Sequence, residues 1–214
     1  MKTVFLLFDS LNRRALSCYG GDTLTPNFQR LADRGITFDN HYVGSLPCMP
    51  ARRDIMTGRL NFMHRSWGPL EPFDQTGPEI LKANGTYSHL ITDHYHYFED
   101  GGLNYQNRFN SWELERGQEW DPWKAVVDAP FDQFKQTYHP LQYDEEGGRA
   151  RGMINRHFIA REEDYSIART FQRGIEFLDQ NGQSNNWFLQ LECFDPHEPF
   201  AAPPEVPRTL SHRL

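Results

Sequence analysis

Short apolar runs alternate along the chain with segments in which apolar residues recur every three or four positions. The continuous apolar run at residues 4–8 predicts a buried strand of a parallel sheet, and further strands are predicted at 87–92 and 187–193. A further strand is predicted at 36–43. Because helical segments separate the strands, the expected class is α/β, with a mainly parallel central sheet flanked by helices.

Four helices are predicted between and beside these strands. Their expected bounds are 26–35, 50–58, 78–83 and 162–178. Prolines stand at the first position of three of them, where a missing N–H costs nothing, and glycines follow their ends. The residues expected to face inward are Phe28, Leu31 and Ala32 in the first helix, and Tyr165, Ala168, Phe171, Ile175 and Leu178 in the last.

Residues 100–152 show no clear periodicity and are rich in Gly, Trp, Asp and Pro. We expect them to form a partly irregular insertion over one face of a single domain, 1–214. Longer loops of this kind usually carry functional residues.

Charge and cysteine content narrow the function classes. A net charge of -7 disfavours a general nucleic-acid binder, which needs clustered lysine and arginine. The three cysteines lie far apart in the sequence, so neither a zinc pair nor a disulfide framework is indicated. The apolar run at the start is too short for a signal peptide, and no run approaches a membrane span, so we predict a cytoplasmic protein without membrane contact.

Polar side chains that could take part in catalysis or ligand binding lie at the ends of predicted strands and helices. They are Asp9, Cys48 with Arg52, the 93–96 cluster and the 195–197 segment. The carboxyl ends of parallel strands meet at one edge of a sheet, which is where α/β proteins bind ligands. We therefore expect these groups to form one site.

Cys48 precedes a predicted helix and is followed by Arg52 one turn later. Helix N–H groups and the guanidinium are expected to lower the pKa of the thiol and to hold a tetrahedral anion beside it. The same features are also compatible with a buried thiol in front of an ordinary helix.

The segment Cys48-Met49-Pro50-Ala51-Arg52 matches C-x-P-x-R, and Thr57-Gly58-Arg59 supplies the T-G-R that follows it in type I sulfatases. The chain thus resembles the N-terminal portion of that family. The resemblance implies an alkaline-phosphatase-like sandwich and hydrolysis of a small-molecule or saccharide sulfate ester. It also implies that a formylglycine-generating maturation enzyme oxidises Cys48 to formylglycine, whose hydrate attacks sulfur with help from Arg52.

The resemblance extends to the metal ligands. Asp9-Ser10 occupies the place of the family's first metal-binding motif, where many members carry two aspartates. It implies that Asp9, Ser10 and modified Cys48 contribute to a divalent cation site. Calcium is the expected ion, with magnesium and manganese as alternatives.

Three histidines acquire roles from the same resemblance. His96 matches a histidine near the formylglycine and is a candidate base. His197, in Pro196-His197-Glu198-Pro199, matches one that contacts sulfate or protonates the leaving alcohol. His94 stands where a sulfate-gripping lysine is usual, and it could replace that lysine only when protonated. This departure resembles the branch that hydrolyses phosphonate monoesters and phosphodiesters, which is the alternative function.

Family members are considerably longer than 214 residues and carry further metal ligands beyond the point where this chain stops. We therefore expect a truncated reading whose tail lacks the usual continuation. A catalytically incomplete fragment is a second alternative. A phosphatase that uses the unmodified cysteine is disfavoured, because such enzymes bracket a longer phosphate loop between cysteine and arginine.

Overall fold

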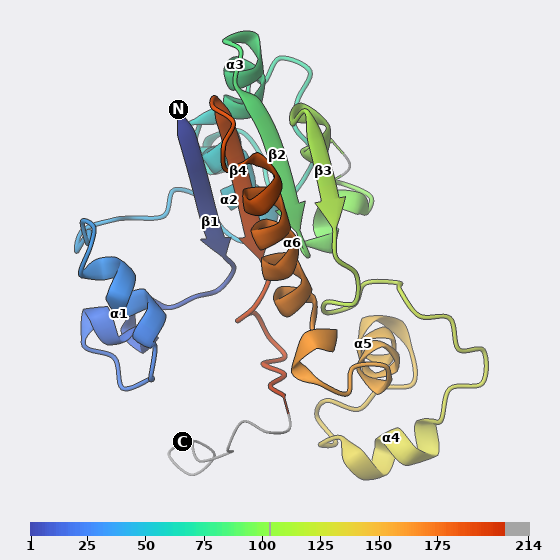
Figure 1. Cartoon of the computed structure of the whole chain (residues 1–214). Coiled ribbons are helices and arrows are strands. Elements are labelled where there is room, and N and C mark those ends of the chain that lie inside the picture. Colours follow the sequence, from blue (N-terminus) through green and yellow to red (C-terminus); the bar gives the residue numbers. More distant parts are fainter. Residues whose placement is uncertain (103, 204–214) are drawn as a thin grey trace.

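Four parallel strands form the centre of the fold, in the order β1-β4-β2-β3. The computed structural model describes residues 1–102 and 104–203, and the predicted aberrant tail at 204–214 lies outside them. The strands are β1 (Lys2–Phe8), β2 (Tyr87–Thr92), β3 (Ser111–Leu114) and β4 (Trp187–Cys193). Figure 1 shows all four arrowheads pointing the same way, toward the side where α4 and α5 lie.

Three predicted strands are confirmed, and the fourth is wrong. The run at 36–43 forms neither helix nor strand, and Ile36, Phe38 and Tyr42 are largely exposed. A strand is stable only when its backbone groups pair with a neighbour, and the described strands offer this segment no ladder. β3 is the strand that the sequence did not predict. It lies at the sheet edge and pairs in parallel with β2 from His89 to Thr92.

The two faces of the sheet carry separate apolar clusters, because successive strand residues point to opposite sides. Leu90 packs on one face with Met49, Met56 and Tyr97. Its neighbour Ile91 packs on the other face with three residues of β4, namely Trp187, Leu189 and Leu191. Helices cover each face, so the expected flanked parallel sheet is confirmed (Figure 1).

The long helix α6 (Ser166–Asn181) crosses one face of the sheet (Figure 1). It begins four residues later than predicted, after a short 3₁₀ turn at Glu162–Asp164. Its buried positions are Ser166, Thr170 and Gly174, whereas Ile175 and Leu178 are partly exposed, so the predicted inward face was rotated. A Cβ at position 174 would lie 3.1 Å from the Leu191 side chain, so small residues let the helix approach β4 closely.

The remaining helices agree with the sequence in part. They are α1 (Pro26–Ala32), α2 (Cys48–Thr57), α3 (Gly77–Ala83), α4 (Phe131–Thr137) and α5 (Gly147–His157). Short 3₁₀ turns lie at Arg13–Ala15, Ser17–Tyr19, Asn61–Met63, Tyr95–Phe98 and Gln106–Arg108.

Two expectations about these helices are corrected. Leu31, expected to face inward, is 65% exposed. The 100–152 insertion is less irregular than predicted, since it contains β3, α4 and the start of α5. Within the described part of the chain, every helix is too short or too polar to cross a lipid bilayer.

Candidate active site

Segments from the carboxyl edge of the sheet converge on the start of α2. Asp9 follows β1, His94 follows β2, and His197 lies in the loop after β4. Asp9, Cys48 and His197 come from distant parts of the sequence, yet each offers a metal-ligating atom and these atoms lie within 4.8 Å of one another. The structure thus brings together three of the residues that the sequence placed in one site.

Cys48 is the first residue of α2 rather than the residue before it. Its Sγ lies 4.0 Å from His197 Nε2. The expected lowering of its pKa is wrong. Burial, and after it the negative charge of Asp9, raise the pKa of Cys48 to about 12, which outweighs the opposing effect of Arg52. The unmodified thiol is therefore protonated near neutral pH and is a poor nucleophile.

Arg52 is buried at 5% exposure and is held by two carboxylates. Its Nη1 lies 2.7 Å from Asp9 Oδ2, and its Nε and Nη2 both lie 2.8 Å from Glu192 Oε1. Nη1 is also 3.5 Å from the carbonyl oxygen of Cys48. Arg52 therefore connects the end of β1 and the central strand β4 to the first turn of α2.

Glu192 is a site residue that the sequence interpretation missed. It is fully buried in β4, and its Oε2 accepts hydrogen bonds from Tyr97 Oη at 2.8 Å and from Gln190 Nε2 at 3.1 Å. A signal was present, because two polar residues interrupt an otherwise apolar strand predicted to be buried. Buried carboxylates persist only with partners, so such an interruption points to a paired charge.

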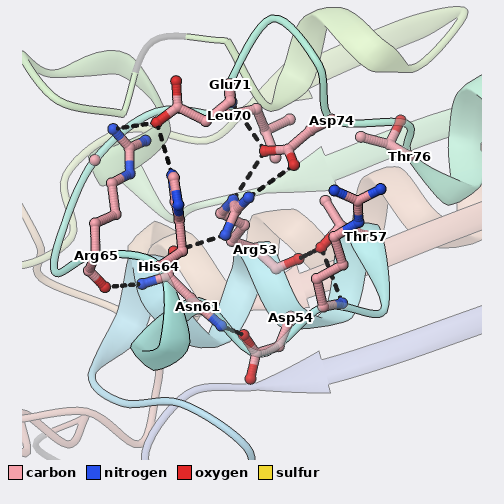
Figure 2. Close-up of polar contacts among 12 residues, drawn as sticks. Arg53, Asp54, Thr57, Asn61, His64, Arg65, Leu70, Glu71, Asp74 and Thr76 are labelled. Carbon is pink, nitrogen blue, oxygen red and sulfur yellow. Dashed lines mark hydrogen bonds and ion pairs between the residues drawn. The ribbon is translucent and has the colours of Figure 1, made fainter.

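The opposite side of α2 is anchored by Arg53 (Figure 2). Its guanidinium makes a bidentate contact with Asp74, at 2.8 and 2.7 Å, and Nη1 lies 3.4 Å from Asn61 Oδ1. Asp74 also accepts the N–H of Glu71 at 2.9 Å. Neighbouring arginines thus hold α2 from two directions, which fixes the position of Cys48 at its N-terminus.

His94 lies inside the site rather than at its surface. It is fully buried, its Nε2 is 3.9 Å from Asp9 Oδ2, and neither ring nitrogen has a hydrogen-bond partner. Burial, followed by the positive charges of Arg52 and two histidines, lowers its pKa well below the ordinary value. The ring is neutral at neutral pH, so a cationic grip on sulfate is not available from His94 there.

His96 is paired with two glutamates. Its Nδ1 contacts Glu99, and its Nε2 lies 3.4 Å from Glu119 Oε2. Burial opposes the positive charge, but these carboxylates outweigh it and raise the pKa of His96 above its ordinary value. This pairing favours a charged imidazolium and disfavours the role of a free base that the resemblance implied.

Asp93 anchors the start of the loop that carries His197. This buried carboxylate accepts the N–H of Phe194 at 2.6 Å and the hydroxyl of Ser166 at 2.8 Å. Burial raises the pKa of Asp93 to about 7, against the effect of these hydrogen bonds. His197 Nδ1 lies 2.9 Å from the carbonyl of Glu198, so its Nε2 is the nitrogen directed at Cys48.

The side chains around Cys48 offer ligand atoms for a divalent cation. Asp9 supplies carboxylate oxygen, which calcium, magnesium and manganese all accept, and Ser10 Oγ donates to Asp9 Oδ1 at 3.0 Å. The unpartnered nitrogens of buried His94 also face this place. Cys48 sulfur suits a hard cation poorly, whereas an oxygen at that position would suit it well. The residues fit a cation site once Cys48 is modified.

Comparison with known proteins agrees with this geometry. The sulfatase family model matches residues 2–213. The chain belongs to the sulfatase family. Among curated sulfatases, the N-acetylglucosamine-6-O-sulfatase of Bacteroides thetaiotaomicron is 31% identical over 123 residues, which is 56% of this chain and 22% of that protein.

Solved structures show the same fold. A protein in complex with its substrate D-glucosamine-2-N,6-O-disulfate has a TM-score of 0.62 at 22% identity, covering 94% of this chain and 36% of that one. An alkaline phosphatase superfamily protein from Vibrio parahaemolyticus has a TM-score of 0.58 at 17% identity, covering 99% and 44%. The phosphonate monoester hydrolase of Agrobacterium radiobacter has a TM-score of 0.57 at 18% identity, covering 95% and 42%.

These likenesses confirm the expected alkaline-phosphatase-like fold. The chain spans less than half the length of each of these proteins.

Proposed function

We propose that this sulfatase-family chain hydrolyses a sulfate monoester at a site whose nucleophile derives from Cys48. The observation that supports this most directly is the convergence of Asp9, Cys48 and His197 on one place, with their ligating atoms within 4.8 Å of one another. These residues lie in three of the motifs that resemble type I sulfatases. A site built from several strand ends is typical of α/β enzymes.

Cys48 is proposed as the residue converted to formylglycine by a maturation enzyme. The hydrated aldehyde supplies an attacking hydroxyl, and its second hydroxyl allows release of sulfate without attack by water. The raised pKa of Cys48 supports this assignment, because the unmodified thiol is protonated near neutral pH. Burial of the first turn of α2 holds the position of the modified side chain.

His197 is proposed to donate a proton to the leaving alcohol. Its Nε2 lies 4.0 Å from Cys48 Sγ, within reach of an ester bound at the nucleophile. As the modified side chain bonds to sulfur and the bond from sulfur to the alcohol oxygen breaks, His197 would give its proton to that oxygen. The Glu198 carboxylate lies 3.3 Å from Nδ1 and would help to orient the ring. Arg52 is a positioning residue in this scheme, because Asp9 and Glu192 already neutralise its charge.

The other two histidines are proposed in supporting roles. His94 would orient Asp9, whose Oδ2 it approaches at 3.9 Å. His96, paired with Glu119 and Glu99, would contribute positive charge at the rim of the site rather than act as a base.

Asp9 and modified Cys48, with Ser10 beside them, are proposed to hold a divalent cation, most simply calcium. Such a cation polarises sulfate oxygens and stabilises negative charge in the transition state. Asp9 now faces Arg52, so the carboxylate is already oriented before a cation arrives. A calcium titration of the matured chain, followed by thermal unfolding, should raise the midpoint for the wild type and leave that of Asp9→Asn unchanged.

The substrate is proposed to be a small-molecule or saccharide sulfate ester. Support comes from the names of the relatives, one of which acts on N-acetylglucosamine 6-O-sulfate groups. The cytoplasmic location stays a prediction from the sequence.

Co-expression with a formylglycine-generating enzyme tests the proposal. Peptide mass spectrometry should show the Cys48 thiol replaced by an aldehyde, and the purified chain should release sulfate from an aryl sulfate. Cys48→Ala should abolish release, whereas Cys18→Ala, which removes a half-buried thiol elsewhere, should retain it. A matured chain that releases no sulfate from any ester would refute the activity.

A phosphonate monoester hydrolase is the second candidate. It is favoured by the neutral state of His94, which removes a cation expected of a sulfate-specific site. Turnover of an aryl sulfate and of an aryl phosphonate by the same matured preparation separates the two functions.

A further inference from the structure

A cavity of about 310 Å³ opens beside the candidate active site. Its walls come from Glu119 and Trp120, from α5, and from the loop at Glu198 and Pro199. Two of these wall residues touch the site directly, since Glu119 contacts His96 and Glu198 contacts His197. The volume lies at the lower end of the range for small-ligand pockets, about 300–1,000 Å³. The cavity therefore borders the candidate site beside His96 and beside the loop that carries His197.

Two arginines on one face of α5 line this cavity. Arg149 and Arg156 are separated by seven residues, or about 10 Å along the helix axis. Within residues 1–102 and 104–203, neither guanidinium makes a hydrogen bond or an ion pair. Arg52 and Arg53 are each neutralised by buried carboxylates, whereas the two α5 arginines have no such ion pair. Arg156 is close enough to Asp195 to act on that carboxylate electrostatically, but the two form no ion pair. Both α5 arginines therefore leave guanidinium donors available to an incoming anion.

The acidic residues of the cavity do not cancel this charge. Glu119 lies 3.4 Å from His96 Nε2, and the pKa of His96 is raised. Glu198 lies 3.3 Å from His197 Nδ1. Both carboxylates therefore already have histidine partners, and neither forms an ion pair with Arg149 or Arg156.

Trp120 provides an aromatic surface in the same wall. Its ring packs against Gly148 of α5 so closely that a Cβ there would lie 2.5 Å from the ring. The absence of a side chain at Gly148 therefore lets the indole pack directly against the helix, while 44% of the Trp120 surface stays exposed. Tyr138 lines the cavity as well. Rigid aromatic surfaces beside charged groups bind ligands that have both apolar faces and anionic substituents.

We propose that this cavity is a subsite for a second anionic group on a saccharide substrate, held by Arg149 and Arg156 while a sugar ring packs on Trp120. The inference rests on the proposed function, because it places the sugar of the sulfate ester on the leaving-group side of His197. It selects multiply anionic saccharides over singly sulfated ones.

The test compares binding to a panel of saccharides that carry one anionic group or several, including glucosamine 6-sulfate and glucosamine 2-N,6-O-disulfate. The variants are the double substitution Arg149→Gln with Arg156→Gln, the charge-preserving Arg156→Lys, and Arg151→Gln as a matched control. Arg151 is exposed on the same helix but does not line the cavity. Far-UV circular dichroism checks that each variant folds.

The wild type should prefer multiply anionic saccharides. The double substitution should weaken that binding about tenfold or more, since hydrogen bonds to charged groups are lost. Arg156→Lys should retain part of the affinity, and Arg151→Gln should bind like the wild type. Equal binding by the wild type and the double variant, no preference for a second anion, or no binding to any saccharide would each overturn the proposal.

Release of sulfate from 4-nitrophenyl sulfate separates the two hypotheses, because this small substrate carries a single anion. If the matured chain cleaves it but shows no preference among saccharides, the subsite fails and the proposed function stands. If multiply anionic saccharides bind through the arginines but no ester is cleaved, the cavity binds anions and the proposed function fails.

Discussion

Replacing Glu192 by glutamine tests whether the buried network at the centre of the sheet holds α2 in place. Glu192 is fully buried, and its Oε1 lies 2.8 Å from both Nε and Nη2 of Arg52. Glutamine has the same shape and can still accept a hydrogen bond, but it carries no charge, so Arg52 would keep only Asp9, at 2.7 Å, as a counter-charge. The substitution thus removes one of two counter-charges from a guanidinium that is 5% exposed.

The expected cost follows from the burial of the pair. Removing one partner of a buried ion pair costs about 3–5 kcal/mol, and the remaining Asp9 contact favours the lower end, about 3 kcal/mol. For a urea m-value of about 2 kcal/mol per M, the midpoint of unfolding should fall by about 1.5 M. Circular dichroism in a urea titration measures this directly.

Glu176→Gln is the matched control. Glu176 also pairs with an arginine at 2.8 Å, but both side chains are exposed, at 45% for Arg173 and 40% for Glu176. Solvent screens such pairs, so the midpoint of this variant should coincide with that of the wild type. A wild-type midpoint for Glu192→Gln, or equal shifts for both variants, would refute the assignment of Glu192 as a structural counter-charge.

Three further predictions follow from the charges around the site. Asp9→Asn should increase the rate at which iodoacetamide alkylates Cys48 at about pH 9 several-fold, because the Asp9 carboxylate raises the pKa of that thiol. Peptide mass spectrometry measures the rate, and an unchanged rate would contradict the prediction. The pKa of His96 is raised in the folded state, so its stabilising contribution is complete below about pH 6.5 and is lost as the pH rises through the folded-state pKa. The urea midpoint of the wild type should fall over that pH range. An equal fall for His96→Gln would exclude His96 as the cause. Asp74→Asn should cost about 3–5 kcal/mol in urea unfolding, because Arg53 loses its buried partner, and a wild-type midpoint would show that the contact is unimportant.

Local patterns were enough to predict much of the sheet and the start of the site. The aromatic, β-branched and other apolar residues at 87–92 and 187–193 located β2 and β4 correctly, because such residues favour strands. Gly58 marked the end of α2, where the backbone adopts a φ of 68° that glycine tolerates best. The C-x-P-x-R motif identified Cys48 and its family from a few adjacent residues.

Patterns failed where a neighbour distant in sequence decides the outcome. The 36–43 run has strand-like composition, but a strand also needs a paired edge, and the described sheet supplies none. The buried face of α6 was mispredicted because contact with β4 favours small residues such as Gly174 over the larger apolar ones nearby. β3 was missed because four half-exposed residues carry too little periodicity to be recognised.

The sequence by itself determined the family motif, the strands that carry it, and the residue types at the site. Only the tertiary structure decided how these groups act on one another. Cys48 has a raised rather than lowered pKa because folding buries it next to Asp9. The pKa of His94 is lowered because the ring is buried beside Arg52, whereas that of His96 is raised because the ring lies between two glutamates. Electrostatic energies depend on distance and burial, and both are set by residues far apart in the chain.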